Sequence, residues 1–543
     1  MFDFTAQQIA ELCSGKLIEG SPDAKANSCH IDSRQLLLGS LFAAFKGKQV
    51  DGHDYLEAAV EAGATILLIS DAKARLALSE KPAVILVDDV LKALQDLASY
   101  QRSLISCPVI GITGSSGKTS TKELLKGALE TGLQVIATEG NYNNELGVPL
   151  TLLRVTKDTE AVIVEMGMRG LGQITELTHI AQPTISIITT IGDAHIEMLG
   201  SRENIARAKG EIFEALSSEQ LALMPLHVDF ADYLRSICAA PVLTVALEQD
   251  AMPAEQTSAQ NKQSADQPAK LTPPANYRAY IKSYDVQGNA LSLVELPTGE
   301  KVEMRLEIPG EHSVQNALLA LAVSQVLGLD PAEAIGGMEQ VRPATMRMQR
   351  CAVNTLPQLE NAHILVDCYN ANPESTAAAL KTLAVSELGD HQTGKRIAVL
   401  GDMLEMGEHA QAVHNDILLL AGLLNIDLVY TYGEHYGLAT QHLLSEVSAG
   451  RCLDNVPELR SLSCMDLLIR GLSAEMTSGS LILIKGSRGM RMERIVEALN
   501  QDENKEVHKS DNSGNSDNRD KSDNDDSGDK IEFCDSSKGG SPC

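Results

Sequence analysis

The sequence predicts an α/β protein with three domains, and three observations carry this prediction. First, the chain has 543 residues, 43% of them hydrophobic, which is enough for several cores of ordinary size. Second, short runs rich in Val, Ile and Leu recur between turn signals. Third, these runs alternate with Ala- and Leu-rich stretches of helical period, which is typical of parallel strands covered by helices.

The first domain is expected over residues 1–106. Three short apolar runs predict its sheet, at residues 41–47, 64–70 and 82–89. Between the first two runs, the stretch YLEAAVEAGA at residues 55–64 has the apolar spacing of a helix. Alternation of this kind predicts a small α/β unit.

The second domain is expected over residues 107–340, as a larger parallel sheet. Its central strands are predicted from the runs at residues 108–113, 161–167 and 185–191. Residues 248–275 are polar, rich in Ala, Gln and Pro and without period, and so predict a flexible insertion. Residues 277–310 alternate in polarity around the turns QGN and PTGE, which predicts antiparallel hairpins that close the same domain.

The third domain is expected over residues 341–500. Four strand-like runs lie about 30 residues apart with helical stretches between them, which predicts a doubly wound, Rossmann-like sheet. These runs are at residues 363–369, 396–402, 427–433 and 480–487. Residues 501–543 are nearly free of apolar side chains and carry twelve acidic against six basic residues, so we expect a disordered acidic tail.

The composition excludes several classes of function. The formal charge is −28, from 45 basic and 73 acidic residues, with no Trp and 3% aromatics, which argues against a nucleic-acid-binding protein. The ten cysteines form no C-x-x-C pair, so no zinc or redox motif is present. The N-terminal residues lack a basic leader with an apolar core, and no apolar run reaches the roughly 18 residues of a membrane span. We expect a cytoplasmic monomer.

A glycine-rich turn between a predicted buried strand and a predicted helix indicates a phosphate site. The general spelling G-x-x-x-x-G-K-[ST] fails, because Ile112 stands five residues before Gly117. The Gly-Lys-Thr triplet in this setting nevertheless favours nucleotide binding. Backbone N–H groups would surround the phosphates, Lys118 would reach the outer ones, and the Thr119 hydroxyl would bind Mg²⁺. The expected nucleotide-binding residues here are Gly114, Ser115, Ser116, Gly117, Lys118, Thr119 and Ser120.

The variant spelling GITGSSGKTS resembles that of the Mur ligases and the related folylpolyglutamate synthases. The resemblance continues through further motifs in the order of that family's ATPase domain and third domain. These motifs are GNYNNELGVP at 140–149, VEMGMRG with Glu165, DAH at 193–195, AKGE at 208–211, DCYNANPES at 367–375, VLGDMLEMGE at 399–408 and KGSRGMRME at 485–493. The resemblance covers about 470 of the 543 residues and leaves out the expected insertion and tail.

The resemblance implies an ATP-dependent amide ligase of peptidoglycan synthesis, with a first domain that binds a UDP-sugar substrate. The third-domain motifs are most similar to those of the member that joins D-alanyl-D-alanine to UDP-N-acetylmuramoyl-tripeptide. The Asp-Asn-Pro-Arg segment of the ligase for the third residue is absent. Such an enzyme converts a carboxylate to an acyl phosphate, and Mg²⁺ holds the two anions together. The implied cofactors are ATP and Mg²⁺.

Five residues are candidates for the magnesium sites and the chemistry. Thr119, Glu165 and His195 offer ligands suited to Mg²⁺, and Lys118 would stabilise the transferred charge. Lys209 lies in the helix-like stretch ENIARAKGEIFEAL, where an ordinary solvated lysine is the simple interpretation. The resemblance implies instead a lysine carried as a carbamate, which would bind a second Mg²⁺.

The remaining site residues come from the resemblance. His312 and Asn316 share one helix face, and Asn316 would contact the adenine side of ATP. Arg347 and Asp367 would hold the phosphates and ribose once the third domain closes; Met346 stands where relatives usually carry glycine. The expected UDP-substrate residues are Ser33, Arg34, Lys46 and Gly47, and the expected dipeptide residues are Tyr369, Asn370, Asn372 and Ser375.

Two alternatives remain open. One is a sister ligase that takes another amino acid or a folate polyglutamate, against which the YNANP segment speaks. The other is a P-loop ATPase that regulates a partner protein through the acidic tail. ATP turnover that needs no amino-acid acceptor would favour this second alternative.

Overall fold

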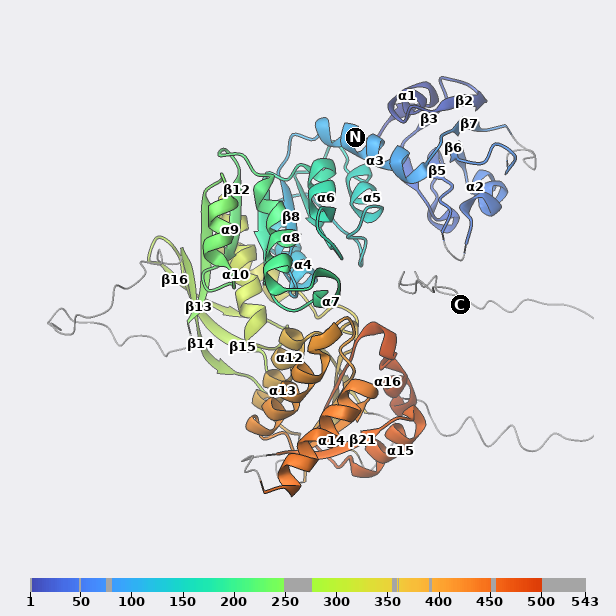
Figure 1. The fold of residues 1–543 in the computed structure, drawn as a ribbon. Helices are drawn as coiled ribbons and strands as arrows, with labels where there is room; N and C mark the ends of the chain where they lie inside the picture. The colour runs from blue at the N-terminus through green and yellow to red at the C-terminus, as the bar shows by residue number, and fades with distance from the viewer. Residues whose placement is uncertain are drawn as a thin grey trace, which may run out of the picture.

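The computed structural model describes residues 2–47, 50–74, 81–248, 276–353, 359, 361–389, 393–450 and 456–500. The expected insertion, apart from Glu248, and the expected acidic tail lie outside the described residues. Three sheet-containing parts follow one another along the chain, with the green central part between the blue N-terminal and orange C-terminal parts (Figure 1). This confirms the α/β class and the three-domain architecture; the residue boundaries stay predictions.

The first domain contains a five-stranded sheet in the order β2-β7-β6-β5-β4. Its strands are β2 (Lys16–Glu19), β4 (Ser28–His30), β5 (Ser40–Ala43), β6 (Ala64–Ile69) and β7 (Ala83–Leu86), and a separate pair joins β1 (Phe4–Thr5) to β3 (Lys25–Ala26). Strands β4 to β7 are parallel, and β2 runs antiparallel to β7. Its helical segments are α1 (Ala6–Leu12), η1 (Ser33–Gln35), η2 (Gly52–Tyr55), α2 (Leu56–Glu61) and α3 (Val90–Ser103). The three strands expected from apolar runs are present.

The central sheet has nine strands in the order β16-β15-β14-β13-β12-β11-β8-β10-β9. They are β8 (Val109–Thr113), β9 (Val135–Ala137), β10 (Ala161–Glu165), β11 (Ile185–Ile188), β12 (Leu221–Pro225), β13 (Val242–Glu248), β14 (Tyr277–Tyr284), β15 (Ala290–Glu295) and β16 (Lys301–Arg305). Strands β8 to β14 are parallel, whereas β14, β15 and β16 form an antiparallel meander. The hairpins expected over residues 277–310 therefore extend the same sheet.

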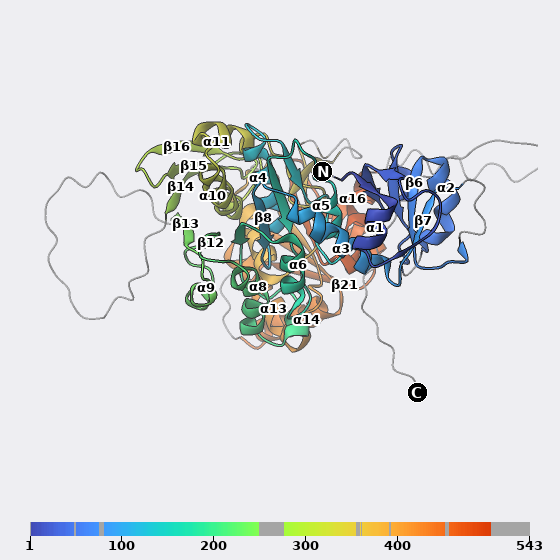
Figure 2. The ribbon, with the colours of Figure 1, turned by 90° about the horizontal axis from the view of Figure 1, so that it is seen from above.

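Helices cover both faces of the central sheet. Val109 of β8 packs into one core cluster, while its neighbour Ile110 packs into the other, because side chains of a strand alternate between faces. Figure 2 shows α4, α10 and α11 on one side of β8 and β12, with α6 and α8 on the other. The helices are α4 (Lys118–Leu129), α5 (Gly147–Leu153), α6 (Gln173–Ala181), α7 (Ile196–Leu199), α8 (Arg202–Glu214), α9 (Ala231–Ile237), α10 (Glu311–Val326) and α11 (Pro331–Glu339).

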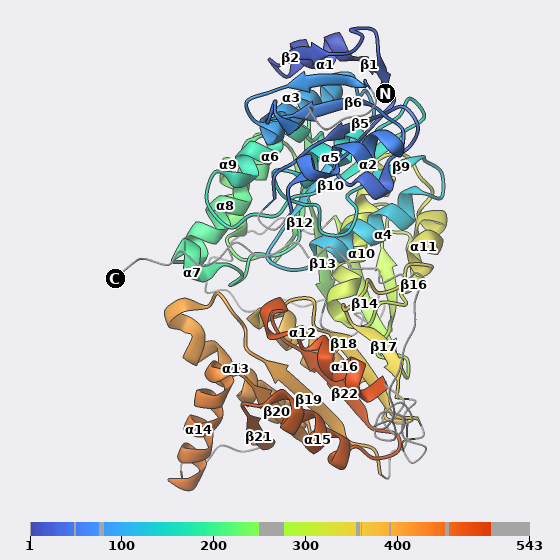
Figure 3. The same cartoon turned by 90° about the vertical axis from the view of Figure 1, so that its right-hand side faces the viewer.

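The third domain is doubly wound, as expected. Its sheet order is β17-β18-β22-β19-β20-β21, with β17 antiparallel and the others parallel. The strands are β17 (Gln349–Ala352), β18 (His363–Asp367), β19 (Arg396–Gly401), β20 (Leu428–Tyr432), β21 (Glu458–Leu462) and β22 (Leu481–Lys485). The helical segments are α12 (Pro373–Val385), η4 (Gly407–His409), α13 (Ala410–Leu423), α14 (Glu434–Ser448), α15 (Met465–Glu475), η5 (Arg488–Met490) and α16 (Glu493–Asn500). Figure 3 shows α13 and α14 on one side of β19 and β20, and α15 and α16 on the other.

Among the helices of the described residues, none has the length and apolar character that a membrane crossing requires.

Candidate active site

The phosphate loop joins β8 to α4, and two glycines set its shape. Gly114 has φ +153°, and a Cβ there would lie 2.0 Å from Oγ1 of Thr189. Gly117 has φ +82°, and a Cβ there would lie 2.9 Å from Oδ1 of Asn316. Only glycine fits both positions. Helix α4 begins directly after Gly117 without a side-chain cap, so its first N–H groups are left for an anion.

The loop is fixed to the segment after β11. The N–H of Ser116 donates to Oγ1 of Thr190 at 2.9 Å, and the N–H of Gly192 donates to Oγ of Ser115 at 2.9 Å. These bonds join residues more than 70 positions apart and hold the loop against the segment after β11.

Lys118 lies where charges from two domains meet. Its ammonium donates to the carbonyl oxygen of Gly114 at 2.6 Å. Burial lowers the pKa of Lys118; the Glu165 carboxylate opposes that shift, and the nearby Arg347 guanidinium adds to it. The third domain therefore brings its predicted ATP residue, Arg347, close to the phosphate loop.

Glu165 is the last residue of β10 and is almost fully buried. It accepts a hydrogen bond from the Thr119 hydroxyl at 3.0 Å and one from the Asn143 amide at 2.8 Å. The two predicted metal ligands, Thr119 and Glu165, are thus in contact. Within the described residues, no group of three or more His, Cys, Asp and Glu side chains is arranged to hold a metal.

Asn143 and Lys122 were not assigned to the site from the sequence. Lys122, on α4, is buried and donates to the carbonyl oxygens of Thr138 at 2.8 Å and Gly140 at 3.4 Å. It thereby ties the phosphate-loop helix to the segment that carries Asn143. The motif GNYNNE contained Asn143, but nothing in its spelling indicated a partner 22 residues further on.

Lys209 is not the solvated lysine of the simple interpretation. It lies on α8 with 2% exposure. Burial lowers the pKa of Lys209 well below its usual value; the charge of Lys118 lowers it further, and Glu374 opposes the shift. The simple interpretation is wrong because α8 packs this face against the sheet.

His195 lies between β11 and α7 with φ +66°. Its Nδ1 lies 2.6 Å from Oε2 of Glu405 in the third domain. The pKa of Glu405 is lowered chiefly by this hydrogen bond, so the carboxylate is charged at neutral pH. The structure gives His195 a partner from another domain.

The predicted ATP residues of the third domain lie beside the central domain. The Arg347 guanidinium stacks on the ring of Tyr369, 4.2 Å from its centroid. Asp367 accepts from Lys485 at 2.6 Å and from the N–H of Met348 at 3.2 Å. Met346 has φ +60°, the left-handed conformation for which the family's glycine is suited.

The predicted dipeptide residues have local partners. Asn372 and Ser375 form the capping box of α12, and the Asn372 amide also lies 3.5 Å from the carbonyl oxygen of Ser115. The carbonyl oxygen of Asn370 accepts from Lys485 at 3.2 Å. Tyr369 supports Arg347. Helix capping thus accounts for two of these residues without a substrate.

The predicted UDP-substrate residues lie on η1 and on the loop after β5 of the first domain. Arg34, on η1 beside Ser33, pairs with Asp32 at 2.9 Å, and Lys46 pairs with Asp51 at 3.5 Å. The N–H of Gly47 donates to the carbonyl oxygen of Val50 at 2.9 Å.

This region lies near the central domain. Burial is the main cause that raises the pKa of Tyr142, and the nearby Asp32 carboxylate raises it further. Tyr142 precedes Asn143, the partner of Glu165. The 139–143 segment therefore connects the first domain to the phosphate site.

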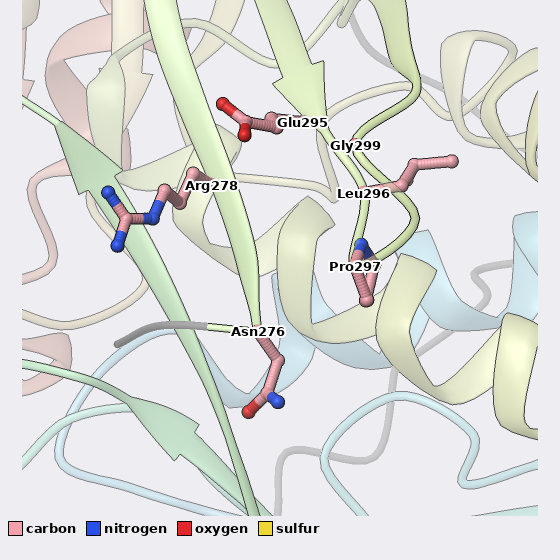
Figure 4. A pocket seen from close by; sticks show the side chains of 6 residues that line it. All are labelled: Asn276, Arg278, Glu295, Leu296, Pro297 and Gly299. Atoms are coloured by element: carbon pink, nitrogen blue, oxygen red, sulfur yellow. The ribbon is translucent and has the colours of Figure 1, made fainter. Parts of the chain in front are cut away.

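A small, open pocket of about 250 Å³ lies elsewhere, between the start of β14 and the turn from β15 to β16 (Figure 4). It is lined by Asn276, Arg278, Glu295, Leu296, Pro297 and Gly299. None of these is a predicted site residue, and the phosphate loop does not line it. We assign the chemistry to the loop, where the charged groups converge.

Comparison with known proteins agrees with this arrangement. Three segments match family profiles, described as Mur ligase family, catalytic domain (25–102), Mur ligase middle domain (112–324) and Mur ligase, glutamate ligase domain (346–488). The chain is 32% identical to a Bacillus subtilis protein named UDP-N-acetylmuramoyl-tripeptide–D-alanyl-D-alanine ligase, over 92% of this chain and 99% of that protein. A Synechocystis protein of the same name is 32% identical, over 91% and 97%.

The structure is likewise similar to that of MurF from Acinetobacter baumannii, with a TM-score of 0.73 and 26% identity over 92% of this chain and 98% of that one. MurF ligase from Thermotoga maritima, solved in complex with ADP, shares the fold with a TM-score of 0.65 and 24% identity, over 87% and 97%. The chain belongs to the Mur ligase family of ATP-dependent amide ligases.

Proposed function

We propose that this chain joins D-alanyl-D-alanine to UDP-N-acetylmuramoyl-tripeptide in the cytoplasm, with ATP as the energy source. The relatives of that name, similar along almost their whole length, support the substrate pair. The observation that carries the reaction class is the convergence of Lys118, Glu165 and Arg347 from two domains on one phosphate loop. The enzyme would act as a monomer.

The nucleotide fits the residues at the loop. The amide nitrogen of Asn316 is buried without a hydrogen-bond partner and belongs to the side chain that lies against Gly117. A buried donor of this kind costs free energy until a ligand satisfies it. Asn316 would meet the adenine side of ATP, and Asp367 the ribose.

The reaction needs an activated carboxylate. The terminal carboxylate of the tripeptide takes the γ-phosphoryl group of ATP, and the amine of the dipeptide attacks the acyl phosphate and expels phosphate. Lys118, Arg347 and the N–H groups of the loop hold the phosphate oxygens while charge moves between them. Their partly buried setting strengthens each of these interactions.

Mg²⁺ fits the same place. Thr119 and Glu165 already bring a hydroxyl and a carboxylate together, which is the oxygen set that this ion prefers. His195 and Lys209, the latter as a carbamate, would complete the set. The ion would neutralise phosphate charge and act as a Lewis acid.

The substrates would be held by the first and third domains. Ser33, Arg34, Lys46 and Gly47 would bind the pyrophosphate of the UDP-sugar through a cation and a close backbone approach. Tyr369, Asn370, Asn372 and Ser375 would lie near the dipeptide. For Asn372 and Ser375 this role would have to coexist with the cap of α12.

A coupled assay of ADP and phosphate release tests this function. Release should require ATP, UDP-N-acetylmuramoyl-tripeptide and D-alanyl-D-alanine together, and the pentapeptide product should appear in equal amount. Turnover with another amino acid in place of the dipeptide would favour a sister ligase. Turnover without any acceptor would favour the regulatory ATPase.

A further inference from the structure

The contact between His195 and Glu405 joins two domains at a residue of the proposed site. His195 follows β11 of the central sheet, and Glu405 follows β19 of the third. Nδ1 of the imidazole and Oε2 of the carboxylate are 2.6 Å apart, and both side chains are about a quarter exposed. Because a carboxylate only accepts, Nδ1 donates the proton in this bond, and in a neutral imidazole with Nδ1–H the lone pair is on Nε2.

The backbone on both sides is shaped for this contact. His195 has φ +66° and Glu405 has φ +63°, a left-handed conformation that residues with a Cβ rarely adopt. A second bond runs from the N–H of Glu197 to the carbonyl oxygen of Glu405 at 3.2 Å. Gly407, with φ +52°, lies against Glu197, and a Cβ there would be 3.3 Å from its Cγ. Two unfavourable conformations therefore meet at one contact, which is common at functional sites.

The segment that carries Glu405, residues 402–406, is rigidly held within the third domain; we call it the arm. The buried Asp402 carboxylate accepts from the N–H groups of His435 at 3.1 Å and Tyr436 at 2.9 Å. The N–H of Met403 donates to Nε2 of His414 at 3.0 Å.

The N–H of the next arm residue, Leu404, donates to Oγ of Ser487 at 2.8 Å. Three successive arm residues are therefore anchored before Glu405. Glu405 is therefore fixed to the third domain, and its contact with His195 requires the two domains to lie together as they do here.

We propose that Glu405 is a positioning residue that holds His195 in the Nδ1–H tautomer, so that Nε2 is available to the magnesium ion of the ligation reaction when the third domain has closed. This inference rests on the proposed function. Carboxylates that fix a metal-binding histidine through its other nitrogen typically change metal affinity or activity 10–100-fold when removed. Here that carboxylate comes from a different domain, which couples domain closure to the assembly of the site.

Another contact between the same two domains provides a matched control. Lys381 on α12 pairs with Glu311 on α10 at 2.9 Å, and both side chains are more exposed than those of the His195 pair. A contact that merely holds the domains together should resemble this one. Lys381→Ala should therefore leave kcat and the KM for ATP within about twofold of the wild type.

The kinetic test compares Glu405→Ala, Glu405→Gln and Lys381→Ala in the full-length enzyme, with melting curves to verify folding. Glu405→Ala should lower kcat about 10–100-fold and leave the KM for ATP within about threefold. Glu405→Gln should recover part of the loss, because its amide oxygen still accepts from Nδ1–H. Equal effects of Glu405→Ala and Lys381→Ala, or an unchanged kcat in Glu405→Ala, would overturn the proposal.

A spectroscopic readout separates this inference from the proposed function. Long-range ¹H–¹⁵N correlation spectra of ¹⁵N-histidine-labelled protein, assigned with His195→Gln, report the tautomer without turnover. We expect Nδ1–H for His195 with an ATP analogue bound, and a mixture in Glu405→Ala. An Nε2–H tautomer in the wild type, or no change in Glu405→Ala, would overturn the inference even if the wild type ligates. A wild type that does not ligate but shows the expected spectra would overturn only the proposed function.

Discussion

The phosphate loop and the UDP-substrate loops differ in where their residues find partners. Ser115 and Ser116 of the phosphate loop bond to a segment more than 70 residues away. Arg34 and Lys46 pair with acidic residues two and five positions away, and their side chains are 59% and 76% exposed. The phosphate loop is therefore fixed by hydrogen bonds to a distant part of the chain, whereas Arg34 and Lys46 have only local ion pairs.

The difference has a consequence for binding. A loop fixed by long-range bonds and by glycine geometry presents its N–H groups to a phosphate without further ordering. Exposed cations with local partners must exchange those partners for the ligand. We expect substitutions at the phosphate loop to affect the chemical step, and substitutions at the substrate loops to affect substrate binding.

The largest effect is expected for Lys118→Ala. The variant should lose at least about 10²-fold in kcat, because it removes a cation at the transferred phosphoryl group. Lys126→Ala, at a half-exposed lysine on the same helix that pairs with Glu130, is the control and should keep full activity. Ligation rates and melting temperatures of the two purified variants make the comparison. A folded Lys118→Ala enzyme with near-normal kcat would remove the phosphate loop from the chemistry.

Lys209→Ala should lose most of the activity as well, but through a different route. If Lys209 carries a carbamate, short carboxylic acids filling the vacated space should partly restore ligation, and only with Mg²⁺ present. The depressed pKa of Lys209 supports this, because CO₂ adds to the neutral amine. Lys118→Ala serves as the control that no acid should rescue. Full activity of Lys209→Ala would return this residue to a packing role.

Arg34→Ala tests the expected role of the UDP-substrate residues in substrate binding. Loss of one charge-assisted contact to the pyrophosphate should raise the KM for the UDP-substrate about tenfold, with kcat little changed. Lys25→Ala, whose side chain is similarly exposed and pairs with Asp3, should change neither constant. Initial rates at varied UDP-substrate concentration measure both. If Arg34→Ala has the kcat and the KM of the wild type, Arg34 does not bind the UDP-substrate.

The smallest effect is expected at Glu374, where α12 meets the central domain. Its carboxylate accepts from the N–H of Asp193 at 2.8 Å, and burial is the main cause that raises the pKa of Glu374. When the pKa of a carboxyl group is higher in the folded than in the unfolded state, its charged form lowers the free energy of unfolding. This loss of stability is fully present above the folded-state pKa and disappears as pH falls through it. Glu374→Gln should therefore melt slightly higher than the wild type at pH 8.

The difference should shrink as pH falls towards the ordinary glutamate range, near pH 4.3. Melting temperatures of both proteins between pH 5 and pH 8 provide the measurement, and the exposed Glu176→Gln variant should show no such trend. If the gain instead grows as the solution is acidified, the Glu374 carboxyl group does not have a raised pKa in the folded protein.

The sequence predicted the strands that are buried inside a sheet, but not the strands that lie at a sheet edge. The runs that became β8, β10 and β11 are apolar because helices cover both faces of the central sheet. Edge strands such as β4 and β21 carry Ser, His, Glu and Arg, since one side meets water. Their period is therefore too weak to separate them from loops.

The burial of Lys209 shows the same limit within the site. The sequence of its helix is charged and amphipathic, and a solvent-exposed lysine at this position would be surrounded by the same local sequence. Only the packing of α8 on the sheet places that residue beside Lys118.

The sequence by itself determined the α/β class and the phosphate loop, because both depend on local rules: the alternation of strand and helix periods, and glycine at positions where φ is positive. The tertiary structure alone decided that Asn143 contacts Glu165 and that Glu405 contacts His195. The second pair is separated by 210 positions, and it meets only because β11 and β19 end at the interface of two domains. Long-range partners of this kind depend on how sheets and helices pack, which no local pattern in the chain records.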